Sequence, residues 1–74
     1  MSEITLDLQG LKCPLPALRT RKVLATLRFG DVVTVECTDR LAAIDIPHLV
    51  SQSGDVIETQ THRGDVLIFR IRKC

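Results

Sequence analysis

The sequence predicts an α+β two-layer sandwich with the element order β-α-β-α-β-β, in which both helices cover one face of a four-stranded mixed sheet. Apolar residues alternate with polar ones in four segments and recur at helical spacing in two others. Three of the four glycines are followed by Asp and then by an aliphatic pair, which is typical of a turn that leads into a strand. Two helices cannot cover both faces of such a sheet, so its other face is expected to meet water. A chain of 74 residues should form one domain, residues 1–74.

The first half of the chain contains a strand, a helix and a second strand. Alternating apolar and polar residues predict half-buried strands over 4–8 and 33–37. Residues 14–28 follow a helical period, with one apolar arc that would face the sheet. That arc comprises Ala17, Thr20, Val23, Leu24 and Leu27. Gly30 is expected to end this helix in a left-handed cap.

The second half contains a short helix and a hairpin. Asp45 is expected as the N-cap of the helix, with Pro47 in the first turn, where its missing N–H costs nothing. Gly54 should end the helix. Residues 55–62 and 65–73 predict two strands joined by a tight turn.

The water-facing side of the sheet should carry polar residues from all four strands. These are Thr5, Asp7, Thr34, Glu36, Glu58, Gln60, Arg70 and Arg72. Opposite charges at Asp7, Glu36, Arg70 and Arg72 are expected to pair across strands, for a few tenths of a kcal/mol each.

The composition narrows the classes of function. Ten basic and nine acidic residues give a formal net charge of +1, so no strong field attracts DNA or an anionic membrane. Two phenylalanines are the only aromatic residues, which disfavours a base-stacking platform. No purely apolar run exceeds four residues, and the acidic, alternating N-terminus does not resemble a targeting segment. We therefore expect a cytoplasmic monomer that binds neither DNA nor membrane.

Three cysteines, an odd number, argue against a disulfide framework in a reducing compartment. Cys37 shares a strand face with apolar residues, so core packing is expected, and a resolving thiol is the alternative. Cys74 is the last residue and is expected to be exposed, with a second reactive thiol as the alternative. His48 and His62 do not combine with the cysteines into a zinc-binding spacing, so neither a metal nor a cofactor is expected.

The segment 11–16, with the sequence LKCPLP, contains the strongest candidate for chemistry. Two prolines this close are tolerated at a helix start, which predicts Cys13 at or next to the N-cap, Pro14 at N1 and Pro16 at N3. There the helix dipole, free N–H groups and Lys12 would lower the pKa of the thiol and make it a nucleophile. No His is near it in sequence, and no second cysteine follows at Cys-x-x-Cys spacing. A lone thiolate that carries a group between partners is therefore favoured.

Basic residues gather around the predicted first helix, namely Lys12, Arg19, Arg21, Lys22 and Arg28. Part of this pattern is the solvated face of an amphipathic helix. The cluster would also surround Cys13, so Arg19, Arg21 and Lys22 are candidates for docking an acidic patch on a partner. Contact with RNA phosphate is the alternative, although the low net charge favours a local docking patch.

The motif Asp7-Leu8-x-Gly10-Leu11-x-Cys13-Pro14-x-Pro16 resembles the signature of the TusA/SirA-like sulfur-carrier family. The resemblance covers nearly the whole chain and extends to Arg21-Lys22, Gly30-Asp31, Thr38-Asp39, Asp45-Ile46-Pro47 and Ile71-Arg72-Lys73. It implies a fold similar to the C-terminal domain of translation initiation factor 3. It also implies that Gly10, Lys12, Pro14 and Pro16 form the helix-start motif around Cys13.

The resemblance further implies a sulfurtransferase activity. Cys13 would accept sulfur as a persulfide from a cysteine desulfurase or a rhodanese and pass it to a protein acceptor of the DsrE/TusD-like kind. The destinations it implies are tRNA thiolation, molybdenum-cofactor enzymes or sulfur oxidation. Arg40 stands where the family pattern has Pro, and Leu15 fills a slot in which some relatives carry an acid. Both departures bear on partner choice.

Two other functions remain open at this point. A regulatory or RNA-contacting module would use the basic first helix and would tolerate loss of Cys13. A thiol redox sensor would pair Cys13 with Cys37 or Cys74.

Overall fold

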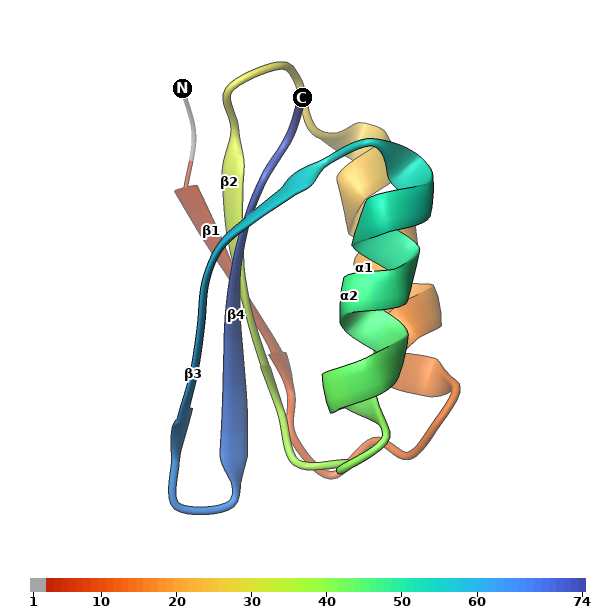
Figure 1. Ribbon diagram of the computed structural model, residues 1–74, viewed down its shortest axis with the longest axis vertical. Coiled ribbons are helices and arrows are strands. Elements are labelled where there is room, and N and C mark those ends of the chain that lie inside the picture. Colours follow the sequence, from red (N-terminus) through yellow and green to blue (C-terminus); the bar gives the residue numbers. More distant parts are fainter. Residues whose placement is uncertain (1–2) are drawn as a thin grey trace.

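The computed structural model describes residues 3–74 and has the expected element order (Figure 1). The elements are β1 (Glu3–Leu8), α1 (Leu15–Thr26), β2 (Val32–Cys37), α2 (Ala42–Ser53), β3 (Val56–Arg63) and β4 (Val66–Arg72). Both helices lie on one side of the sheet, which confirms the two-layer α+β prediction. Among residues 3–74, no helix is long and apolar enough to cross a membrane.

The strand order brings three connections to one end of the molecule. The sheet has the order β1-β2-β4-β3, with β1 and β2 parallel and the other two pairs antiparallel. Because β1 and β2 run in the same direction, the loops that follow them leave the sheet at the same end. The turn between β3 and β4 lies at that end as well, at the bottom of Figure 1. This end holds the motif with Cys13.

The core lies between the sheet and the helices and is almost entirely aliphatic. The alternation predicted for β2 and β4 is confirmed, because Leu67 is half-buried and the other five side chains at alternate positions of these strands are fully buried. These side chains are Val33, Val35, Cys37, Phe69 and Ile71. From the helices, Leu24, Ile46 and Val50 pack against them, each at most 2% exposed. Thr20 is also buried and donates its hydroxyl to the carbonyl of Pro16 at 2.8 Å.

The second helix begins four residues earlier than predicted, at Ala42 instead of Ile46. Asp45 is not its N-cap but lies in its first turn, and Pro47 lies inside the helix. The reason is Asp39, whose carboxylate accepts from the N–H of Leu41 at 2.9 Å and whose carbonyl accepts from the N–H of Ala42 at 3.0 Å. This side-chain-supported turn nucleates the helix ahead of Asp45. Gly54 ends the helix with φ 82°, as predicted.

The first helix ends earlier than predicted. It stops at Thr26, and its C-cap residue Leu27 has extended backbone angles. Gly30 does have a positive φ of 89°, but it lies beyond the helix and does not cap it. Its N–H donates to the carbonyl of Lys73 at 3.0 Å, so this glycine turns the chain into β2 beside the end of β4.

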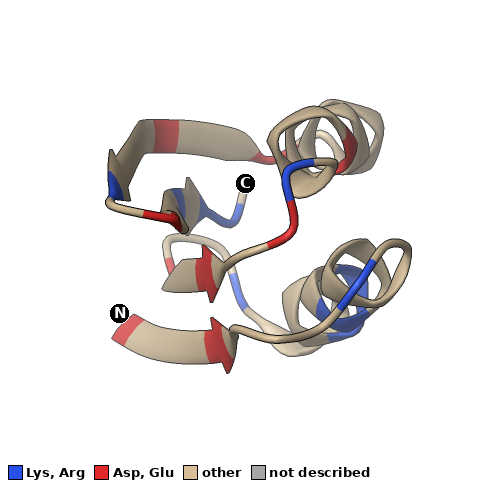
Figure 2. Ribbon diagram, turned by 90° about the horizontal axis from the view of Figure 1, so that it is seen from below, with Lys and Arg blue, Asp and Glu red and all other residues tan. Residues whose placement is uncertain are grey.

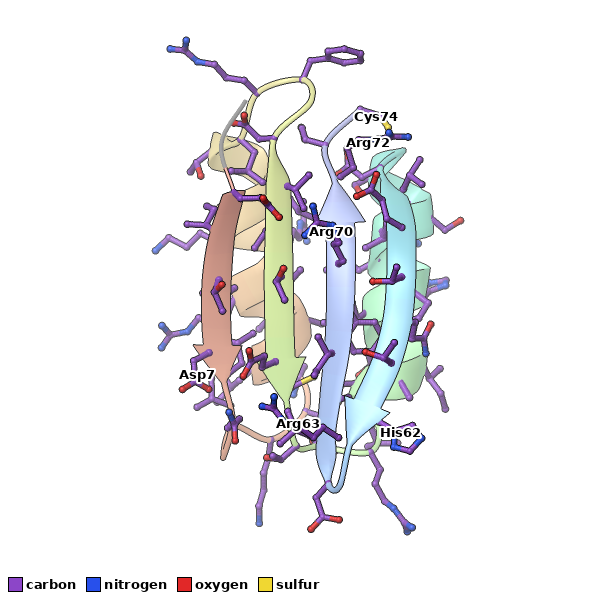
Figure 3. All side chains as sticks on the ribbon, turned by 90° about the vertical axis from the view of Figure 1, so that its left-hand side faces the viewer. Asp7, His62, Arg63, Arg70, Arg72 and Cys74 are labelled. Atoms are coloured by element: carbon purple, nitrogen blue, oxygen red, sulfur yellow. The ribbon has the colours of Figure 1, made fainter. Side chains whose placement is uncertain are left out.

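The face of the sheet opposite the helices is largely polar, as predicted (Figure 3). The expected place of Gln60 on this face is wrong, because a bulge between Ile57 and Thr59 shifts the alternation of β3 and brings Gln60 opposite the buried Phe69. Arg70 pairs with Glu3 of β1 and with Glu58 of β3, and the guanidinium of Arg72 lies 3.3 Å from the same Glu58 carboxylate. These side chains are substantially exposed, so each pair contributes little to the free energy of unfolding. The four residues nevertheless connect the two edge strands across the sheet.

The expected pairing of the arginines with Asp7 and Glu36 is wrong. In the register of β2 and β4, Glu36 lies opposite Ile68, while Arg70 lies opposite Thr34. Asp7 lies at the other end of the sheet from Arg70 in Figure 3. Glu36 instead accepts from the side-chain amide of Gln9 at 3.3 Å.

Candidate functional site

Cys13 lies in the loop between β1 and α1, where its side chain is exposed. The loop is fixed to its neighbour, because the N–H of Gly10 donates to the hydroxyl of Thr38 at 2.9 Å. Gly10 has φ 83°, a left-handed conformation that a glycine adopts without strain. The N–H of Leu11 donates to the carbonyl of Leu8 at 3.2 Å and completes the turn. The sequence thus builds a defined turn in front of the thiol.

The helix start differs by one position from the prediction. Pro14 is the N-cap residue rather than N1, and Pro16 is the second helical residue rather than the third. Cys13 therefore lies next to the N-cap, as expected, and the Cys13–Pro14 peptide bond is cis. No side chain caps α1. The N–H of Leu15 is already used, because it donates to the carbonyl of Lys12 at 2.9 Å.

Two aspartates from the second half of the chain hold Cys13. Its Sγ donates to Oδ2 of Asp45 at 2.9 Å. Its backbone N–H donates to the carboxylate of Asp39. Asp39 lies in the loop after β2, and Asp45 lies in the first turn of α2, so both come from the connection that runs beside the Cys13 loop.

These carboxylates raise the pKa of the Cys13 thiol, whereas the sequence predicts that it is lowered. The pKa of Cys13 is raised above its ordinary value, first by the hydrogen bond to Asp45, then by desolvation and by the negative charges of Asp45 and Asp39. The expected lowering by the helix dipole is therefore wrong. The thiol faces Asp45 rather than the start of α1, and the N–H of Leu15 is occupied by Lys12. The contact with Asp45 thus favours the protonated form of Cys13.

The pKa of the Asp39 carboxylate is shifted in the opposite direction to that of the Cys13 thiol. The N–H groups of Leu41 and Cys13 hold the pKa of Asp39 below its usual range, and the charge of Lys12 acts in the same direction. Asp39 is therefore a stable anion that ties the Cys13 loop to the start of α2.

Two hollows lie beside the loop between β2 and α2. One, of about 350 Å³, is lined by Gly10, Leu11, Lys12, Thr38, Asp39 and Arg40. The other, of about 690 Å³, lies between the start of α2 and the β3–β4 turn and is lined by Thr38, Arg40, Ala43, His62, Gly64, Asp65 and Leu67. Thr38 and Arg40 contribute to both. Figure 2 views this end and shows an acidic and a basic segment adjacent in the loop before α2.

The basic residues predicted to dock a partner are exposed on α1. Arg19, Arg21 and Lys22 all belong to this helix, and Figure 2 shows Lys and Arg positions in blue on the otherwise tan ribbon. None of the three forms an ion pair within the part of the chain that the structure describes. Their charges are therefore available to a partner, and their role in docking stays a prediction.

The other cysteines occupy different environments. Cys37 is 0% exposed and packs in the core, as predicted, and burial raises the pKa of its thiol to about 11. Cys74 is exposed, as predicted, while its backbone N–H donates to Asp55 at 3.0 Å. Figure 1 places the C-terminus at the end of the molecule opposite the start of α1. Across residues 3–74, no group of three or more potential metal-ligating side chains is found.

The contact with Asp45 is the feature that the sequence reasoning missed. Asp45 was interpreted only as a helix cap, and it lies 32 positions from Cys13. The signal was available in the β-α-β order at the start of the chain, because two adjacent strands joined through a helix run parallel and present their following loops at one end of the sheet. That geometry would have placed the residues after position 37 beside the Cys13 loop.

The molecule is thus a small α+β protein with an exposed thiol directly before Pro14, at the start of α1. The model of the family described as Sulfurtransferase TusA matches residues 4–73. The chain belongs to this family and is a sulfur carrier protein of the TusA type.

Three proteins with similar sequences are also named as sulfur carrier proteins. "Putative sulfur carrier protein NMB0681" from Neisseria meningitidis serogroup B is 49% identical over 57 residues, which cover 77% of each chain. "Putative sulfur carrier protein YrkI" from Bacillus subtilis is 38% identical over 97% of this chain and 96% of its own. "Sulfur carrier protein TusA" from Allochromatium vinosum is 35% identical over 92% of this chain and 90% of its own.

Proposed function

We propose that Cys13 is the residue that carries sulfur, as a persulfide. The observation that supports this most strongly is the contrast among the three thiols. Cys13 is exposed on a loop with Gly10, Pro14 and Pro16, directly after Lys12, which lines the smaller hollow, whereas Cys37 is buried in the core. Cys74 is exposed but lies on the last residue, outside any such loop.

The transfer consists of two exchanges at sulfur. On loading, the Cys13 sulfur attacks the terminal sulfur of a donor persulfide, a new S–S bond forms, and the donor sulfur leaves with the electron pair of the broken bond. The thiol proton of Cys13 ends on the donor thiol. On unloading, an acceptor thiol attacks the terminal sulfur of the Cys13 persulfide, and Cys13 leaves in turn. Neither exchange requires a net oxidant or a cofactor.

The partners follow from this chemistry. A cysteine desulfurase or a rhodanese supplies a donor persulfide, and a DsrE/TusD-like protein serves as an acceptor. Arg19, Arg21 and Lys22 provide positive charge near the loop for an acidic surface on either partner. Leu15 is 43% exposed next to this loop, so it adds an apolar contact at the position where some relatives carry an acid. The final recipient lies in tRNA thiolation, in molybdenum-cofactor maturation or in sulfur oxidation.

The test is the mass of the intact protein after incubation with a cysteine desulfurase and cysteine. Wild type should gain the mass of one sulfur atom, and a thiol reductant should remove it. Cys13→Ser should gain nothing while remaining folded, and the matched variant Cys74→Ser should load like wild type. A rhodanese with thiosulfate is the second donor. If neither donor loads a folded chain whose Cys13 is alkylatable, the persulfide function is wrong and a regulatory module takes its place.

A further inference from the structure

The hydrogen bond between Cys13 and Asp45 places a negative charge beside the sulfur. Sγ and Oδ2 are 2.9 Å apart, and a second tie from the backbone of Cys13 to Asp39 keeps the thiol at the start of α2. Helix α2 itself is fixed to the sheet by Ile46, the residue after Asp45, which is 0% exposed. The carboxylate and the sulfur are therefore held together by packed structure rather than by two flexible chain ends.

No cation in the described part of the chain, residues 3–74, forms an ion pair with Asp45 that offsets this charge. The other charged groups near the thiol are Asp39, which adds negative charge, and Lys12, whose charge acts on Asp39. Any negative charge that develops on Sγ thus meets an uncompensated carboxylate.

We propose that Asp45 slows the unassisted loss of sulfur from Cys13, so that the carrier keeps its sulfur between partners. The proposal rests on the proposed function. When a nucleophile attacks the terminal sulfur of the persulfide, the S–S bond breaks and its electron pair passes to Cys13 Sγ, directly beside Asp45. A sulfur that is a weaker leaving group departs more slowly. The raised pKa of the Cys13 thiol has the same physical cause and the same direction.

A partner-free assay isolates this effect. A chain with Cys74→Ser is loaded with inorganic polysulfide, which transfers one sulfur to Cys13 and is released one sulfur shorter, and excess polysulfide is removed. Cyanide then attacks the terminal sulfur, thiocyanate forms, and the Cys13 thiol returns. Cys37 is buried and should contribute no signal. The measured quantity is the rate of thiocyanate formation under conditions in which cyanide attack is rate-limiting.

Asp45→Asn should release sulfur severalfold faster than the parent chain. Asp65→Asn is the matched control, because it removes the same charge from the exposed β3–β4 turn and should release sulfur at the parent rate. Asp45→Ser also removes the charge and provides a second test in case Asp45→Asn does not fold. In the unloaded chain, alkylation of Cys13 should reach half of its maximal rate at a lower pH in both Asp45 variants.

An unchanged release rate in folded Asp45 variants overturns the proposal, as does an equal acceleration in Asp65→Asn. Failure of the proposed function gives a different result. In that case the desulfurase leaves wild type unloaded, while the polysulfide and cyanide assay still compares the variants.

Discussion

Cys37 should be almost inert in the folded chain, and the size of this effect follows from its environment. Burial raises the pKa of its thiol from 9.0 to about 11. At a pH of about 8, roughly 9% of an ordinary thiol is ionised, but only roughly 0.1% of Cys37, so ionisation alone slows alkylation about 90-fold. Exclusion of the reagent from a side chain that is 0% exposed slows it further. If Cys37 behaves in this way, it is not a resolving thiol for Cys13.

The assay follows iodoacetamide labelling of each cysteine by peptide mass spectrometry. The perturbation is unfolding in urea, which returns Cys37 to an ordinary aqueous environment and so provides its own reference. Labelling of Cys37 should be at least about 90-fold faster in urea than in buffer at a pH of about 8, after correction for the reagent rate in urea. A difference of less than about tenfold would refute the reasoning, because Cys37 would then be neither buried nor shifted.

The remaining predictions concern stability and docking. The pKa of Cys37 is higher in the folded chain than in the unfolded chain, so ionisation of this thiol should lower the free energy of unfolding as the pH rises from 9.0 toward about 11 and should not affect it below 9.0. Urea midpoints of Cys37→Ala should lack this contribution to the pH dependence. Asp55→Ala should lower the free energy of unfolding by about 1–3 kcal/mol in urea titrations, because the N–H of Cys74, which donates to Asp55 at 3.0 Å, loses its partner; a change below about 0.5 kcal/mol contradicts this. A triple charge reversal on α1 should slow sulfur transfer from an acidic donor and weaken its salt dependence, whereas unchanged kinetics remove the docking role. It combines Arg19→Glu, Arg21→Glu and Lys22→Glu.

Local patterns in the sequence predicted the fold correctly, because each element is encoded by neighbouring residues. The alternation of Val33, Val35 and Cys37 predicted a half-buried strand, and all three side chains are fully buried. The start of α2 was predicted wrongly because Asp45 and Pro47 form a strong local helix-start signal. The side chain of Asp39, six positions before Asp45, supports a turn that nucleates the helix at Ala42.

The position of the candidate site was predictable, but its electrostatics were not. The two prolines identified Cys13 from sequence, since they restrict this segment to a helix start. The direction of its pKa shift depends on Asp39 and Asp45, which are 26 and 32 positions away. The helix dipole and Lys12 are local charges, and the predicted lowering of the pKa depended on them alone. The predicted sign was therefore wrong.

The central claim, that Cys13 carries the sulfur, is tested most directly by locating that sulfur in the wild-type chain, where all three thiols compete. The protein is loaded briefly by a cysteine desulfurase, alkylated, and cleaved, and the peptides are sequenced by tandem mass spectrometry. The additional sulfur should appear on the peptide with Cys13 first and should leave that peptide when an acceptor is added. Its appearance on Cys74 with Cys13 unmodified would contradict the account.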